Sequence, residues 1–223
     1  MITKRLKNCV NNHGFTLIEL LISLVLTLIV LGGVYQLYTS QTKAYNVQNQ
    51  VAEMQQNVRI AMDVITRSIR SAGYDPTESD KFGFTNAAFA ESNNGGIAVP
   101  DAITIYLTID NDGDGAILND ATEKIGYRLS GGNLQILTNP AGPTWNDLAE
   151  SISALTFTYT FDDGGTGLPN NGVPGDKIDD IRIVQVSITG RTSKKDPTWP
   201  HNDGAGVGYR TRTLTSNVRP RNY

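Results

Sequence analysis

The residues best suited to chemistry in this 223-residue chain are carboxylates. The stretch DNDGDG places three of them at alternate positions: Asp110, Asp112 and Asp114. Carboxylates at this spacing, followed by glycine, match the first half of an EF-hand loop, whose oxygens converge on one calcium ion. The twelfth position is Ala121 rather than glutamate, so Asp120 or Glu123 would have to supply the last ligand. Two interpretations follow, a calcium site or a solvated acidic hairpin turn.

Another carboxylate, Glu19, lies inside the apolar run FTLIELLISLVLTLIVLGGVYQLY, residues 15–38. A run of this length can cross a bilayer core about 30 Å thick. An ionisable group there costs about 2.5–3.5 kcal/mol. Cleavage after Gly14 would create a positive amine on Phe15, and this amine could neutralise Glu19 of a neighbouring subunit. The alternative is a carboxylate tolerated near the helix end, within reach of water or lipid headgroups.

A short basic segment precedes the apolar run. Residues 1–14 contain Lys4, Arg5 and Lys7 and no acidic residue. Basic flanks stay in the cytoplasm, so the chain beyond Tyr38 should face the other side of the membrane. An ordinary signal peptide has a shorter apolar region followed by a small-residue cleavage site, and no such site follows this run. The plausible cleavage point therefore lies before it.

The sequence from Gly14 to Leu20, GFTLIEL, resembles the prepilin motif of type IV pilins and type II secretion pseudopilins. In that family a membrane prepilin peptidase cuts between the glycine and the phenylalanine and N-methylates the new terminus. The resemblance implies cleavage between Gly14 and Phe15, methylation of Phe15, and an assembly role for Glu19. It also implies three partners: the prepilin peptidase, other pilins or minor pilins, and the bacterial inner membrane. The protein would be single-pass, with its head outside the cytoplasm, before joining a pilus or pseudopilus.

A helical pattern continues beyond the apolar run. Apolar residues recur every three or four positions at Val47, Val51, Met54, Val58, Ala61, Ile65 and Ile69. This spacing gives one apolar stripe on a continuous helix. Gly73 followed by Pro76 is a helix stop signal, so we expect the helix to run from about Thr16 to Ala72.

After the helix the apolar period changes to two. Strands are predicted at 103–109, 125–136 with a tight SGGN hairpin turn, 155–161, 181–189 with a bulge at Ile183-Val184, and about 209–218. Successive strands with short turns imply an antiparallel sheet. The predicted fold is α+β, with a long transmembrane helix packed by its second half on that sheet, as the pilin-like resemblance also implies. The predicted parts are a leader 1–14, a membrane half 15–38, a periplasmic half 39–75 and a β-rich head 76–223.

Later stretches refine the resemblance. DIRIVQVSIT from Asp180 and the closing YRTRTLTSNVRPRNY from Tyr209 resemble PilW-type minor pilins. Such minor pilins are thought to prime or cap a filament. The J-type minor pseudopilin of type II secretion is the alternative.

Other classes of function fit the composition less well. After leader removal the chain keeps His201 and no cysteine, because Cys9 is removed, so we do not expect an enzyme. A DNA-contacting pilin for uptake is the rival of another class. Removing three positive charges from a net charge of −3 leaves −6, which disfavours nonspecific nucleic-acid binding. We expect the local cations Arg182, Arg210 and Arg212 to lie on wet strand positions or to pair with acidic loops.

Overall fold

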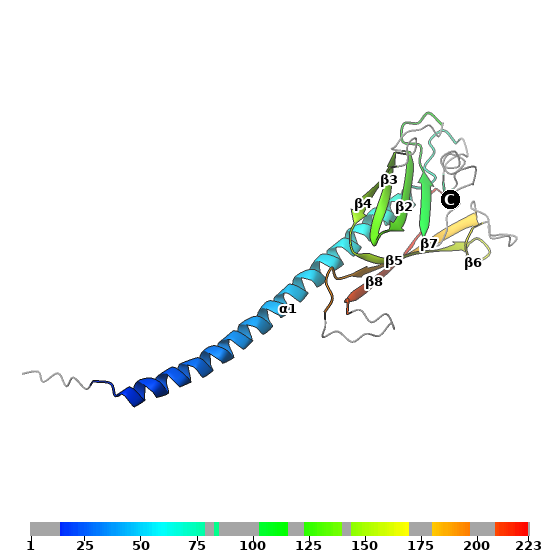
Figure 1. The fold of residues 1–223 in the computed structure, drawn as a ribbon. Helices are drawn as coiled ribbons and strands as arrows, with labels where there is room; N and C mark the ends of the chain where they lie inside the picture. The colour runs from blue at the N-terminus through cyan, green and yellow to red at the C-terminus, as the bar shows by residue number, and fades with distance from the viewer. Residues whose placement is uncertain are drawn as a thin grey trace, which may run out of the picture. The chain divides into compact units, whose positions relative to one another are not determined.

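The computed structural model describes residues 14–78, 83–84, 103–115, 123–139, 144–169, 180–196 and 208–222. It divides into two compact units, an N-terminal unit Met1–Val47 and a head unit Gln48–Tyr223. The division falls inside one helix, α1 (Leu17–Ser71). One long apolar N-terminal helix and antiparallel sheets make up the described chain, which confirms the predicted α+β class (Figure 1).

In the N-terminal unit α1 exposes its apolar side chains on all sides. Every residue from Gly14 to Tyr38 is exposed, and Phe15 is 82% exposed. This part of α1 is long and apolar enough to cross a membrane. A helix that is apolar all round needs lipid or other helices around it, because water solvates such a surface poorly.

In the head unit the same helix buries one stripe. Its buried residues are Met54, Val58, Ala61, Met62, Ile65, Thr66 and Ile69, which include five of the seven positions of the predicted stripe. The helix ends at Ser71, one residue before the expected Ala72, and the φ of +73° at Gly73 suits glycine just beyond a helix C-terminus. The Gly73 N–H donates to the carbonyl of Thr108 at 3.1 Å, so the helix end is attached to the first strand.

In the part of the chain that the structure describes, the strands form two four-stranded antiparallel sheets rather than one. The first sheet has the order β1-β2-β3-β4, made of Thr104–Thr108, Lys124–Ser130, Asn133–Asn139 and Thr144–Ala149. The second sheet has the order β6-β5-β7-β8, made of Thr166–Gly167, Ile152–Phe161, Ile181–Arg191 and Thr211–Val218. The sequence did not predict β4 or β6, because TWNDLA alternates weakly and β6 has two residues.

The chain changes sheet between β4 and β5. Ser151 adopts a positive φ of 60°, and the Ile152 N–H donates to the Gly132 carbonyl at 2.8 Å. This bend sends β5 away from the edge strand β4, and β5 then pairs with β6 and β7. Alternation of apolar and polar residues gives each strand one apolar face, but it does not determine which strands pair. The sequence therefore predicts a single sheet as the simpler arrangement.

The predicted hairpin turn is confirmed, whereas the predicted bulge lies at a different residue. Gly131 and Gly132 have φ values of 62° and 83°, which makes the β2–β3 turn a tight hairpin turn. The irregularity in β7 lies at Arg182, because Thr160 pairs with Ile183 and Phe161 pairs with Ile181. The predicted bulge at Ile183-Val184 is therefore one residue too late. Extruding Arg182 leaves Val184 fully buried and lets the guanidinium reach an acidic turn.

Both sheets contribute to one core around the head part of α1. Ile105, Leu107, Tyr127 and Leu134 come from the first sheet, and Leu155, Phe157, Tyr159, Val184, Val186 and Ile188 come from the second. The helix lies close to β7 at Gly190, where an added Cβ would lie 2.4 Å from the Cγ2 atom of Val58. Ser68 and Tyr127 join the helix to the first sheet by a 2.7 Å hydrogen bond between their hydroxyls. Burial raises the pKa of the Tyr127 phenol, so this hydroxyl stays protonated.

Candidate functional site

The predicted processing junction lies just before α1. Gly14, Phe15 and Thr16 are non-helical, and a Cβ added at Gly14 would meet nothing within 4 Å. Phe15 is largely exposed. A peptide bond in exposed, non-helical backbone can enter a protease site without unwinding a helix, so the geometry suits cleavage here.

Glu19 forms a capping box with Thr16. The Thr16 N–H and hydroxyl lie 3.5 and 3.4 Å from the Glu19 Oε2 atom, and the Glu19 N–H donates to the Thr16 hydroxyl at 3.3 Å. This reciprocal pattern satisfies backbone donors at the helix start. We did not predict this role, although the T-x-x-E spacing of Thr16 and Glu19 carries the signal. Glu19 therefore has a local structural role beside any role between subunits.

The acidic loop gathers four carboxylates. Oxygens of Asp110, Asp112, Asp114 and Glu123 all lie within 4.8 Å of one another. Asp110 and Glu123 are 0% and 1% exposed, whereas Asp112 and Asp114 are exposed. The fifth predicted ligand, Asp120, lies outside the described residues. Carboxylate oxygens are the ligands that a hard cation such as calcium prefers, and calcium takes about six to eight oxygens, some of them from backbone carbonyls and water.

Strand pairing and glycine turns position this cluster. Asp110 follows β1 and Glu123 precedes β2, and the Ile109 N–H donates to the Glu123 carbonyl at 3.0 Å. The two oxygens of Asp110 accept N–H groups of Gly113 and Gly115 at 2.6 and 3.2 Å. Both glycines have positive φ, 80° and 68°. The loop is thus folded around Asp110 itself, and the pairing of β1 with β2 brings Glu123 back to it.

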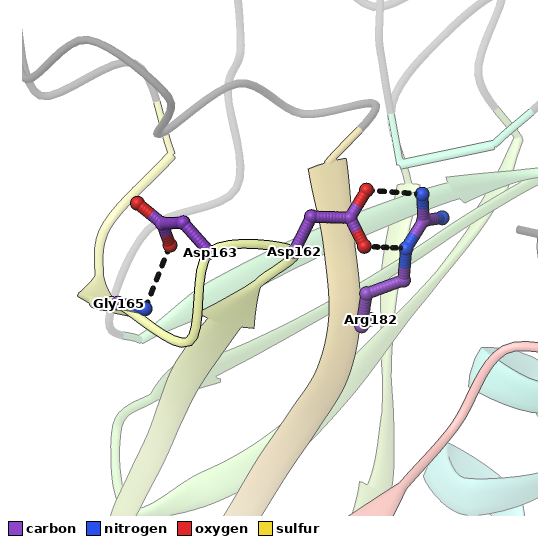
Figure 2. A network of polar contacts seen from close by, with 4 residues as sticks. All are labelled: Asp162, Asp163, Gly165 and Arg182. Atoms are coloured by element: carbon purple, nitrogen blue, oxygen red, sulfur yellow. Dashed lines mark hydrogen bonds and ion pairs between the residues drawn. The ribbon is translucent and has the colours of Figure 1, made fainter.

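Two of the three later arginines singled out in the sequence form ion pairs, and the third is exposed. In Figure 2 the Nε and Nη2 atoms of Arg182 face the two oxygens of the Asp162 carboxylate. The Oδ1 atom of Asp163 accepts the Gly165 N–H at 2.7 Å. The Arg182 hydrogen bond lowers the pKa of Asp162. Arg210 pairs with Asp196 at 2.8 Å, and Arg212 is exposed on β8. The expectation of wet or paired positions therefore holds for Arg182, Arg210 and Arg212. His201 lies outside the described residues.

Two family models together match most of the chain. The model of the family described as prepilin peptidase-dependent protein B matches residues 47–219, and that of the prokaryotic N-terminal methylation motif matches residues 9–35. Among solved structures, the chain is similar to a type IV-like pilin from Thermus thermophilus, at 10% identity and a TM-score of 0.40 over 75% of this chain and 97% of that one. None of the curated proteins compared with the chain matches it. The chain belongs to the prepilin peptidase-dependent protein B family and carries a type IV pilin N-terminal methylation motif.

Proposed function

We propose that this protein is a minor type IV pilin of the PilW type that takes part in priming or capping a filament. It would be a structural subunit rather than an enzyme. The main support for this proposal is that the family model matches residues 47–219 and the methylation motif matches residues 9–35. The precursor would be a single-pass inner-membrane protein with the head unit outside the cytoplasm, because the basic leader stays inside.

The exposed N-terminal part of α1 supports assembly with other subunits. From Gly14 to Tyr38 every residue is exposed in the single chain. Lipid can cover this surface before assembly, and helices of other pilins can cover it in a filament. Glu19 would then meet the methylated amine of a neighbouring Phe15, which would neutralise both charges away from water.

N-terminal mass spectrometry of membrane and filament fractions tests processing. We expect a mature chain that begins at N-methylated Phe15. Gly14→Leu should leave uncut precursor in the membrane, because a bulky side chain would obstruct the cleavage site. Gly32→Leu is the matched control and should be cut normally. An intact leader in the wild type, or a start beyond residue 35, would contradict the proposal.

Deletion of the protein tests its role. A priming or capping subunit should be scarce relative to the major pilin in sheared filaments, and its loss should sharply reduce the number of surface pili. Export of type II secretion substrates should continue. Normal piliation combined with lost secretion would instead identify the J-type pseudopilin.

We also propose that the acidic loop binds calcium and stabilises the head unit. The supporting observation is that carboxylates of Asp110, Asp112, Asp114 and Glu123 converge within 4.8 Å, two of them buried. Four negative charges this close repel one another, and a divalent cation would offset the repulsion. Asp120 remains a candidate fifth ligand. At free calcium about 10 to 100 times the dissociation constant, the gain in unfolding free energy would be about 1.4–2.7 kcal/mol.

Thermal melting of the full chain in nonionic detergent, with calcium or with a chelator, tests this site. Calcium should raise the melting temperature of the wild type and should not do so in Asp112→Ala/Asp114→Ala. The matched control is Asp162→Ala/Asp163→Ala, which removes two carboxylates from the other acidic turn and should keep the calcium response. An unchanged wild-type midpoint would refute the site.

A further inference from the structure

A basic pocket lies where the C-terminal tail meets the end of α1. Its volume is about 490 Å³, and it is lined by Arg67, Arg70, Ser71, Tyr74, Arg221 and Asn222. Arg67, Arg70 and Arg221 are all exposed. The pocket lies beside the acidic loop, because the Tyr74 carbonyl accepts the Asp110 N–H at 2.8 Å, but none of its lining residues belongs to the carboxylate cluster.

Backbone contacts hold the pocket together. The Arg221 N–H donates to the Arg70 carbonyl at 3.2 Å, and the Asn222 side-chain amide donates to the Ala72 carbonyl at 3.1 Å. These bonds satisfy carbonyls at the helix C-terminus, which intrahelical bonds leave open. They also place Arg221, from the last residues of the chain, beside Arg70. These two bonds therefore fix where Arg221 lies relative to the end of the helix.

The charge at this site exceeds what the helix needs. A cation near a helix C-terminus interacts favourably with the helix dipole, and Arg70 in the last turn fills that role. Arg67 also forms an ion pair with Asp63 at 2.8 Å. Arg221 adds a further cation, with the Tyr74 ring and the Asn222 amide beside it. Guanidinium groups match carboxylates with two parallel hydrogen bonds, so this arrangement suits an anionic ligand.

We propose that this pocket docks a short acidic segment of a neighbouring pilin subunit. The proposal rests on the proposed function, which makes other pilins the neighbours of this chain. A mature chain with a net charge of −6 would repel a long polyanion, whereas a local pocket of arginines can still bind a few carboxylates. Pairing of Arg182 and Arg210 with Asp162 and Asp196 also neutralises two of the cations that an extended nucleic-acid surface would use.

Fluorescence anisotropy tests the pocket directly. The probes are a fluorescein-labelled peptide of glutamates and a labelled single-stranded oligonucleotide of equal charge, titrated with the full chain in nonionic detergent. We expect the peptide to bind, and Arg70→Gln/Arg221→Gln to weaken binding by at least about tenfold, because each charged hydrogen bond lost costs about that much. Arg59→Gln/Arg212→Gln removes two exposed arginines elsewhere and should change peptide binding by less than about twofold.

Each other outcome overturns the proposal. Absence of peptide binding, or an equal loss in both double variants, would show that the pocket is not a specific site. Tighter binding of the oligonucleotide, lost in the pocket variant, would identify a nucleic-acid site instead. The measurement uses purified chain and needs no filament, so its failure is distinguishable from a failure of processing or assembly.

Site-specific crosslinking then tests the partner. A photo-crosslinking amino acid in place of Tyr74, in cells that assemble the filament, should form an adduct with another prepilin-processed subunit. Mass spectrometry should place the adduct beside a cluster of carboxylates in that subunit. An adduct with DNA or lipid at this position would contradict the proposed partner.

Discussion

The two parts of α1 present the same kind of residue to opposite surroundings. From Phe15 to Leu37 the large apolar side chains are 51–82% exposed in the single chain. From Met54 to Ile69 the buried stripe has exposures of only 0–7% for its apolar members. The head part finds its partner in the two sheets of the same chain, whereas the N-terminal part finds none among the described residues.

This difference separates two sources of stability. Burial in the head contributes to folding of the single chain, at about 25 cal/mol per Å² of apolar surface. The N-terminal surface can contribute only when lipid or other subunits cover it. Substitutions in the two parts of one helix should therefore affect different measurements, assembly in one case and unfolding in the other.

The largest expected effect is on assembly, at Glu19. Glu19→Val should insert into the membrane but should lose filament incorporation by more than about a hundredfold, because breaking a buried charge pair costs about 3–5 kcal/mol. Glu19→Gln is the sharper variant, since glutamine can keep the capping box with Thr16 while removing the charge. Quantification of the subunit in sheared filaments is the measurement. Normal incorporation of Glu19→Gln would show that capping, and not charge, is what matters.

The next largest effect is on the unfolding free energy of the head, which should respond to substitutions in one part of α1 and not in the other. Ile65→Ala should lower the unfolding free energy of the head by about 2–5 kcal/mol, because Ile65 is 0% exposed in the core. Leu26→Ala, in the exposed N-terminal part, should leave the thermal unfolding of the head unchanged. Circular dichroism melting of the full chain in detergent measures both. An equal loss of unfolding free energy in the two variants would contradict the difference between the two parts of α1.

A smaller effect is expected where the helix touches β7. Gly190→Ala should destabilise the head by about 1–3 kcal/mol, since its Cβ would meet Val58 at 2.4 Å. The double variant Gly190→Ala/Val58→Ala should lose less stability than the sum of the losses in the two single variants. The smaller side chain at position 58 makes room for the new Cβ at position 190. Melting temperatures of all four chains give the coupling. Strict additivity would show that the helix and β7 are not in close contact there.

The smallest effect is expected at the exposed ion pair of Figure 2. Arg182 lowers the pKa of Asp162 below its ordinary 3.8, so the pair stabilises the folded state above that pH. This contribution is lost as the pH falls through the lowered pKa, because the carboxyl becomes protonated. Arg182→Gln should therefore melt slightly lower than wild type near neutral pH, and this difference should shrink as the pH falls below 3.8. A difference that grows on acidification would have the wrong sign.

Local patterns in the sequence predicted much of this molecule. Spacings of three and four predicted the buried stripe of α1, and Gly73 predicted its end. Ser130-Gly131-Gly132-Asn133 predicted a hairpin turn, which the structure has between β2 and β3. These features depend on residues close together in the chain, where backbone preference and periodicity determine the outcome. The prepilin motif is local in the same sense, and the family match confirms that resemblance.

Contacts between distant residues required the tertiary structure. Alternation could not say that β5 leaves the first sheet and pairs with β7, because each apolar face fits either arrangement. The basic pocket joins Arg70 to Arg221, and no local pattern connects a helix end to a C-terminal tail. The sequence alone determined the helix, its membrane-compatible start and its acidic loop. Only the fold decided which strands, carboxylates and arginines meet, because those contacts depend on how the chain closes around its core.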